Sequence, residues 1–134
     1  MILADTDVLI DFLLDITPVA GEIAAYAAAD RLWTTAITCF ELLCGAEESR
    51  RGDRVRRLVE SINVLPLDRP AAQRAAEVRR SLDRSGRAIG MADSLIAGIA
   101  LAHDLPLFTR NRSHFERVPG LELIGIAGTR SKAR

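Results

Sequence analysis

The sequence predicts an α/β domain with a central parallel sheet of about four to five strands flanked by helices, and three observations support this. Short apolar runs alternate with longer segments that suit helices. The runs are apolar at nearly every position, which is typical of strands buried on both faces. Carboxylates stand where apolar runs end, at Asp5, Glu41 and Asp93. In open α/β sheets, ligands bind at the edge where the strands end.

Length and composition indicate one domain with an aliphatic core. The chain has 134 residues, of which 49% are apolar and only 4% aromatic, so Ala, Leu, Ile and Val must fill the core. Eighteen basic residues balance eighteen acidic ones, which neither favours nor excludes nucleic acid as a partner. There is no basic, apolar leader and no apolar run long enough to cross a bilayer, so we expect a cytoplasmic protein without membrane contact.

The first half of the chain contains two predicted strands and four predicted helices. Residues 1–4 are apolar and predict a strand, and Asp5-Thr6-Asp7 is a polar turn before a helix over 8–14. Pro18 lies near the start of a helix over 17–29. The β-branched run 32–37 predicts the second strand, and helices are predicted over 38–48 and 51–62.

The second half continues the alternation. Residues 64–67 predict a third strand. Because Pro66 has no N–H to donate, it lies on an edge strand or at the end of a strand. A helix over 68–84 ends at Ser85-Gly86, and another follows Gly90 over 91–102. Strands are predicted over 105–109 and 121–126. We expect one domain over residues 1–127 and a disordered basic tail over 128–134.

Three carboxylates at one sheet edge predict a metal site. Delivered there by separate segments, Asp5, Glu41 and Asp93 would repel one another unless a cation lay between them. Hard cations such as Mg²⁺ or Mn²⁺ take oxygen ligands of this kind. Asn111, which follows the 105–109 strand, is a candidate for a fourth oxygen ligand.

Each of these residues also has a structural alternative. Asp5 and Asp7 could stabilise the turn or cap the first helix, and Asp7 is well placed for the cap. Asn111 could stabilise a turn. Glu41 lies three residues after Thr38, as in a capping box. Asp93 could complement a helix dipole.

Four motifs in order resemble the PIN-domain ribonucleases, most closely the VapC toxins of bacterial toxin–antitoxin pairs. They are Ile2-Leu3-Ala4-Asp5-Thr6-Asp7-Val8-Leu9-Ile10, Thr38-Cys39-Phe40-Glu41-Leu42-Leu43-Cys44-Gly45-Ala46, Gly90-Met91-Ala92-Asp93-Ser94-Leu95-Ile96-Ala97 and Leu107-Phe108-Thr109-Arg110-Asn111-Arg112-Ser113-His114-Phe115. The resemblance implies a three-layer PIN-like domain that hydrolyses RNA with Mg²⁺ or Mn²⁺. It also implies a homodimer, and a cognate VapB-like antitoxin whose tail occupies the active-site groove.

The resemblance also assigns roles to residues. Asp5, Glu41 and Asp93 match the catalytic metal ligands, and Thr6 and Thr109 match hydroxyl residues of the site. Asn111 is neutral where the family often has an acid. The candidates for substrate contacts are Thr6, Thr109 and His114. Because an acidic site would repel RNA, Arg110 and Arg112, which flank Asn111, are predicted to contact its phosphates.

Other classes of protein fit less well. The single Lys, Lys132, lies in the predicted tail, which argues against haloacid-dehalogenase-like phosphatases and response-regulator receivers. The main alternative is a catalytically weakened PIN fold that binds an antitoxin or RNA.

Overall fold

The structure of the chain is a computed structural model that describes residues 1–125 and 130–132. Its strands are β1 (Ile2–Ala4), β2 (Leu32–Thr35), β3 (Asn63–Leu65), β4 (Leu107–Phe108), β5 (Glu122–Ile124) and β6 (Arg130–Lys132). Its helices are α1 (Thr6–Leu13), α2 (Val19–Ala28), α3 (Ala36–Cys44), α4 (Arg50–Ser61), α5 (Arg69–Arg84), α6 (Met91–Ala102) and α7 (Arg112–Phe115). None of the described helices is long and apolar enough to cross a membrane.

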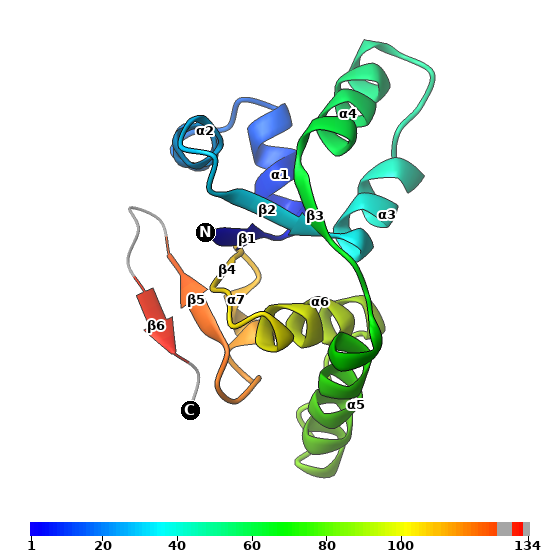
Figure 1. The fold of residues 1–134 in the computed structure, drawn as a ribbon, viewed down its shortest axis with the longest axis vertical. Helices are drawn as coiled ribbons and strands as arrows, with labels where there is room; N and C mark the ends of the chain where they lie inside the picture. Colours follow the sequence, from blue (N-terminus) through cyan, green and yellow to red (C-terminus); the bar gives the residue numbers. More distant parts are fainter. Residues whose placement is uncertain (126–129, 133–134) are drawn as a thin grey trace.

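The strand β1 lies inside the sheet, between β2 and β4. In the described part of the chain the sheet order is β3-β2-β1-β4-β5-β6. The pairs from β3 to β5 are parallel, and β6 runs antiparallel to β5. From β1 the chain builds the sheet outward to β3 and then returns to add β4 and β5 on the other side (Figure 1). The carboxyl ends of β1 and β4 therefore form a topological switch point, where such sheets bind ligands.

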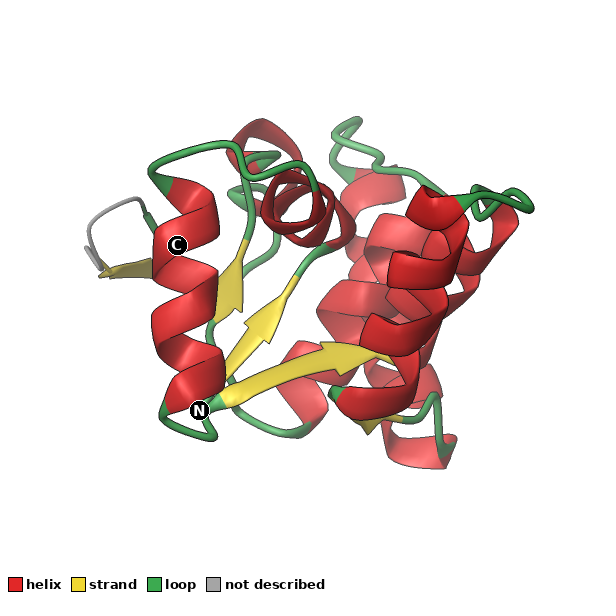
Figure 2. Ribbon diagram, turned by 90° about the horizontal axis from the view of Figure 1, so that it is seen from above, coloured by secondary structure: helices red, strands yellow, loops and turns green. Residues whose placement is uncertain are grey.

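Helices cover both faces of the sheet, which confirms the predicted three-layer class (Figures 1 and 2). Successive side chains of a strand point to opposite faces, so β1 contributes to two cores. Ile2 and Ala4 pack in one core with Ile23 of α2. Leu3 packs in the other core with Ile99 of α6. The helices α1 to α4 line the first face, and α5 to α7 line the second.

The predicted strands and helices are present, and the differences lie mainly at their ends. The strand β2 stops at Thr35, two residues early, because the Thr35 side chain caps α3. Pro66 directly follows β3 at the sheet edge, as predicted. The short helix α7 was not predicted. Residues 130–132, predicted to be disordered, form β6, while the rest of the predicted tail and the boundary at residue 127 lie outside the described residues.

The helices α5 and α6 approach closely at Gly98. A Cβ at this position would lie 2.6 Å from the Cβ and the backbone N of Ala75 and 2.7 Å from the carbonyl oxygen of Ala71. These contacts are shorter than van der Waals distances, and two of them involve backbone atoms that cannot swing away. The packing of α6 on α5 holds the helix that carries Asp93, so Gly98 supports the site as well as the core.

We therefore expect Gly98→Ala to lower the free energy of unfolding by about 1–3 kcal/mol, the usual effect of overpacking. Urea denaturation would measure it. The matched control is Gly21→Ala in α2, where nothing lies within 4 Å of the added Cβ. There the better helix propensity of Ala should leave stability unchanged or raise it by up to about 1 kcal/mol. Equal changes in both variants would contradict the close α5–α6 packing.

Candidate active site

The Asp5 carboxylate lies at the switch point, directly after β1, and is only 5% exposed. Its Oδ1 accepts a hydrogen bond from the backbone N–H of Thr6 at 2.8 Å. Its Oδ2 accepts one from the hydroxyl of Thr109, which follows β4, at 2.7 Å. Burial raises the pKa of Asp5 to about 7, and the nearby charges of Asp7 and Asp93 add to the rise, although both hydrogen bonds oppose it.

Asp5 also begins helix α1, which corrects the predicted turn. Its side chain is the N-cap, and the helix starts at Thr6 rather than at Val8. Asp7, the alternative cap in the sequence analysis, lies in the first turn instead. One residue thus terminates the strand, starts the helix and presents a carboxylate at the sheet edge.

Glu41 comes from α3 and is connected to Asp5 through Thr6. The Thr6 hydroxyl donates to Oε1 of Glu41 at 2.7 Å and lies 3.1 Å from the Thr38 hydroxyl. The predicted capping box at Thr38 is wrong, because Thr35 caps the helix by accepting from the Thr38 N–H. Glu41 lies well inside α3 and does not act as a cap, and this removes the structural alternative for its role.

Asp93 lies in the first turn of α6 and contacts two residues of the segment after β4. Its Oδ2 is 3.2 Å from Nδ2 of Asn111 and 2.9 Å from Nδ1 of His114. Those two nitrogen atoms are 2.9 Å apart. When Nδ1 carries a proton, both nitrogens donate to Asp93 and do not bond to each other. The Asn111 side chain donates to Asp93 and makes no cap bond to α7.

A continuous chain of hydrogen bonds joins the three predicted metal ligands. Beyond the bonds already given, the N–H of Asn111 donates to the Thr109 hydroxyl oxygen at 2.9 Å. The connection therefore runs from Glu41 through Thr6 to Asp5, then through Thr109 and Asn111 to Asp93. Residues of α1, α3 and α6 meet here with Asp5, which follows β1, and with the segment after β4.

Two acids that the sequence analysis did not assign to the site, Asp7 and Asp11, also face the β4–α7 segment. Asp7 Oδ2 accepts from the backbone N–H of Arg110 at 3.0 Å, and burial raises the pKa of Asp7. Asp11 is buried and pairs with the Arg110 guanidinium at 2.6 Å and 3.2 Å. Both acids lie on α1, four residues apart and hence on one helical face. This spacing was the signal in the sequence that could have placed them together beside the site.

The second predicted phosphate contact, Arg112, lies apart from this hydrogen-bonded chain. Its guanidinium contacts Glu116 at 3.4 Å and the Ser131 hydroxyl of β6 at 2.6 Å. The side chain is one-third exposed. Its contact with RNA stays a prediction.

The oxygen atoms at the switch point suit a hard cation, although they are not closed around one. In the described residues, no three His, Cys, Asp or Glu side chains are arranged to hold a metal ion. However, each carboxylate oxygen can accept more than one contact, so Asp5 keeps acceptor capacity. Asp7 Oδ1 is buried and has no hydrogen-bond partner among the described residues. The carboxylate oxygens of Asp5, Glu41 and Asp93 are ligands of the kind that Mg²⁺ or Mn²⁺ prefers.

Comparison with known proteins identifies the architecture. Residues 2–121 match the PIN domain family. Ribonuclease VapC10 of Mycobacterium tuberculosis is 35% identical over 115 residues, which cover 86% of each chain. The tRNA(fMet)-specific endonuclease VapC of Shigella flexneri is 37% identical over 95 residues, or 68% of this chain and 72% of the relative. A crystal structure of DNA-bound VapBC from Salmonella typhimurium matches with a TM-score of 0.76 and 30% identity, covering 92% of this chain and 97% of that one.

The raised pKa of Asp5 predicts a pH-dependent stability. Between about pH 4, the ordinary pKa of an unfolded Asp, and the folded value of about 7, the folded state holds a proton that the unfolded state has lost. Without divalent cations, the free energy of unfolding should therefore fall as the pH rises from 5 to 8. Asp5→Asn should reduce this fall by on the order of 1–4 kcal/mol.

Urea denaturation at a series of pH values would measure both proteins. Asp104→Asn is the matched control, because Asp104 is exposed and outside the site, and it should keep the wild-type slope. An equal slope in the Asp5→Asn protein would show that burial does not raise the pKa of Asp5.

Proposed function

This chain belongs to the PIN-domain family and, within it, to the VapC ribonucleases; on that premise we propose that it is an Mg²⁺- or Mn²⁺-dependent endoribonuclease toxin, neutralised by a cognate VapB-like antitoxin. The observation that carries this proposal is the buried Asp5 at the switch point, which is connected to Glu41 through Thr6 and to Asp93 through Thr109 and Asn111. RNA is the substrate, and hydrolysis of its phosphodiester bonds is the reaction.

In this proposal Asp5, Glu41 and Asp93 hold the cation, and Asn111 is a further candidate ligand. A bound Mg²⁺ or Mn²⁺ polarises phosphoryl oxygen and lowers the pKa of water. The surrounding hydroxyls and amides orient the ligands: Thr6 holds Glu41, and Thr109 holds Asp5. A nearby cation would favour the ionised form of Asp5 and so offset the burial that raises its pKa.

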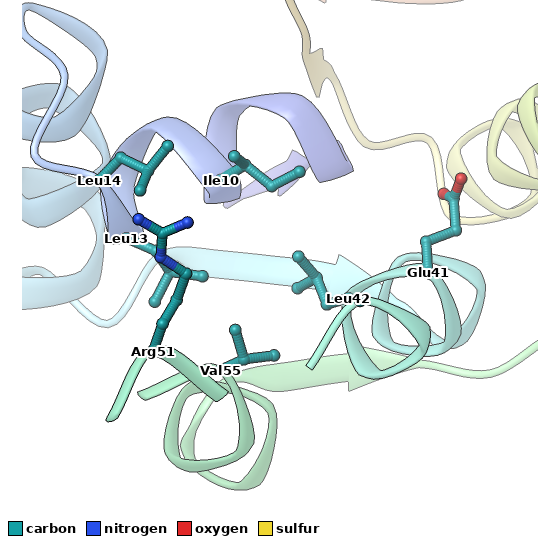
Figure 3. A pocket seen from close by; sticks show the side chains of 8 residues that line it. Ile10, Leu13, Leu14, Glu41, Leu42, Arg51 and Val55 are labelled. Carbon is teal, nitrogen blue, oxygen red and sulfur yellow. The ribbon is translucent and has the colours of Figure 1, made fainter. Parts of the chain in front are cut away.

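The site of antitoxin binding is proposed to include an apolar groove that starts at Glu41. The groove is lined by side chains of α1, α3 and α4 and by the residues that directly follow α1 and α3 (Figure 3): Ile10, Leu13, Leu14, Glu41, Leu42, Gly45, Arg51 and Val55. The walls are aliphatic, with an acid and a base among the lining residues. A peptide tail with apolar side chains could bury them there and extend to the catalytic carboxylates. We expect this groove to hold the antitoxin tail.

Dimerisation and location stay predictions. Phe40 and Met91 are 67% and 68% exposed, and they are sequence neighbours of Glu41 and Asp93. These two side chains are our candidates for the contact of the expected homodimer. The cytoplasm remains the predicted location.

The catalytic proposal predicts that Asp93→Asn lowers RNA cleavage by at least about 100-fold, because even partners of metal ligands typically contribute 10- to 100-fold. Cleavage would be measured with Mg²⁺ or Mn²⁺, and with EDTA, on tRNA(fMet) and on other RNAs. Asp104→Asn makes the same chemical change at an exposed position and should retain activity. The variants also expose trace ribonuclease contamination, which would cleave equally in every sample.

Equal cleavage by wild type and Asp93→Asn that EDTA abolishes would contradict the catalytic role of Asp93, whereas equal cleavage that persists in EDTA would come from contamination. An absence of cleavage with every RNA and metal would favour the weakened PIN fold that acts by binding.

The groove predicts a separate effect on the antitoxin. Leu14→Glu places a charge on the apolar wall and should weaken antitoxin binding by at least about tenfold, since burial of one Leu contributes about 1.5–3 kcal/mol. RNA cleavage by the free toxin should be retained. Leu67→Glu is the control, because Leu67 is similarly exposed but outside the groove. Unchanged binding of the Leu14→Glu protein, measured by calorimetry, would place the antitoxin elsewhere.

A further inference from the structure

Three consecutive residues after β4 each contact a different carboxylate of the site region. Thr109 donates to Asp5 through its hydroxyl, and Asn111 donates to Asp93 through its side-chain amide. Arg110, between them, contacts α1 twice: its N–H donates to Asp7, and its guanidinium pairs with Asp11. The segment has no regular secondary structure of its own. Its position therefore depends on these side-chain contacts.

The Arg110–Asp11 pair has the geometry of a strong ion pair. The Nε lies 2.6 Å from Oδ2 of Asp11, and Nη2 lies 3.2 Å from Oδ1. One edge of the planar guanidinium thus meets both carboxylate oxygens, the arrangement that gives Arg its specificity for carboxylates. The Asp11 side chain is only 6% exposed, whereas that of Arg110 is 51% exposed. Removing one partner from a buried carboxylate costs more stability than breaking a pair of surface charges.

We propose that Arg110 is a positioning residue that fastens the 109–111 segment to α1 through Asp11, and that it is not primarily a phosphate contact. This inference rests on the proposed function. The fastening keeps Thr109 on Asp5 and Asn111 on Asp93. An RNA phosphate would have to compete with a buried carboxylate for the same guanidinium edge.

The proposal distinguishes two ways in which Arg110 could act. A phosphate contact strengthens RNA binding directly, and its loss raises the dissociation constant and lowers the salt slope by about one. A fastening residue holds the catalytic carboxylates in place, so its loss slows the chemical step and leaves RNA binding largely intact. Asp11 separates the two cases, because it is an acid and has no attraction for phosphate.

The test compares Arg110→Gln, Arg110→Lys, Asp11→Asn and the Arg110→Gln/Asp11→Asn double variant of the full chain. Arg110→Gln and Asp11→Asn should each lower the single-turnover cleavage rate by about 10- to 100-fold, with RNA affinity within about threefold of wild type. The double variant should be no slower than the singles, because both remove one interaction. Arg110→Lys keeps the charge but loses the two-point geometry, so it should rescue only part of the rate.

Amide hydrogen exchange supplies a second measurement that does not require RNA or metal. The N–H groups of Arg110 and Asn111 should exchange faster in these variants, while the N–H of Ile99 in the core of α6 should not change. Faster exchange throughout the protein would contradict the proposal, because it would show that Arg110 and Asp11 stabilise the whole fold and not the 109–111 segment in particular. Arg74→Gln, which breaks the exposed Arg74–Glu77 pair, is the control and should change neither measurement.

The opposite pattern would overturn the proposal. If Arg110→Gln weakens RNA binding and reduces its salt slope while Asp11→Asn cleaves normally, Arg110 is a phosphate contact. If wild type cleaves no RNA, the proposed function fails but the exchange measurement still decides whether Arg110 fastens the segment.

Discussion

The Asp5 carboxylate is only 5% exposed although it lies at the edge of the sheet where ligands bind, and the other site residues are arranged around this burial. Removing a carboxylate from water disfavours its charged form, which is why the pKa of Asp5 rises to about 7. Two hydrogen bonds, from the Thr6 N–H and the Thr109 hydroxyl, offset only part of that cost. A cation bound as proposed would offset more of it.

Threonines and short polar side chains connect the carboxylates across the sheet edge. Thr6 connects α1 to Glu41 on α3, and Thr109, which follows β4, bonds to Asp5, which follows β1. Asn111 continues the connection to Asp93 on α6. Each connector donates through a hydroxyl or amide and brings no negative charge of its own. Hydrogen bonding can therefore hold three acids near one another without adding to their mutual repulsion.

The packing of the helices sets how precisely these acids meet. Asp93 depends on the position of α6, and α6 packs closely on α5 where Gly98 meets Ala71 and Ala75. Glu41 depends on where α3 begins, which is set by the Thr35 cap. The site is thus assembled from both layers of helices and from the sheet between them. This explains why the residues concerned are separated by up to about one hundred positions in the chain.

The sequence by itself determined the alternation of strands and helices and the parallel class of the sheet, because apolar patterning is a local property. It also singled out Asp5, Glu41 and Asp93 as candidate site residues, because they stand where apolar runs end. It did not determine the Asp5 and Thr35 caps, since several neighbouring Asp and Thr residues could cap equally well. Nor did it show α7, β6 or the pairing of Arg110 with Asp11. These depend on contacts between distant segments. From the sequence alone, Arg110 is a candidate for a phosphate contact, whereas in the fold its guanidinium pairs with the buried carboxylate of Asp11.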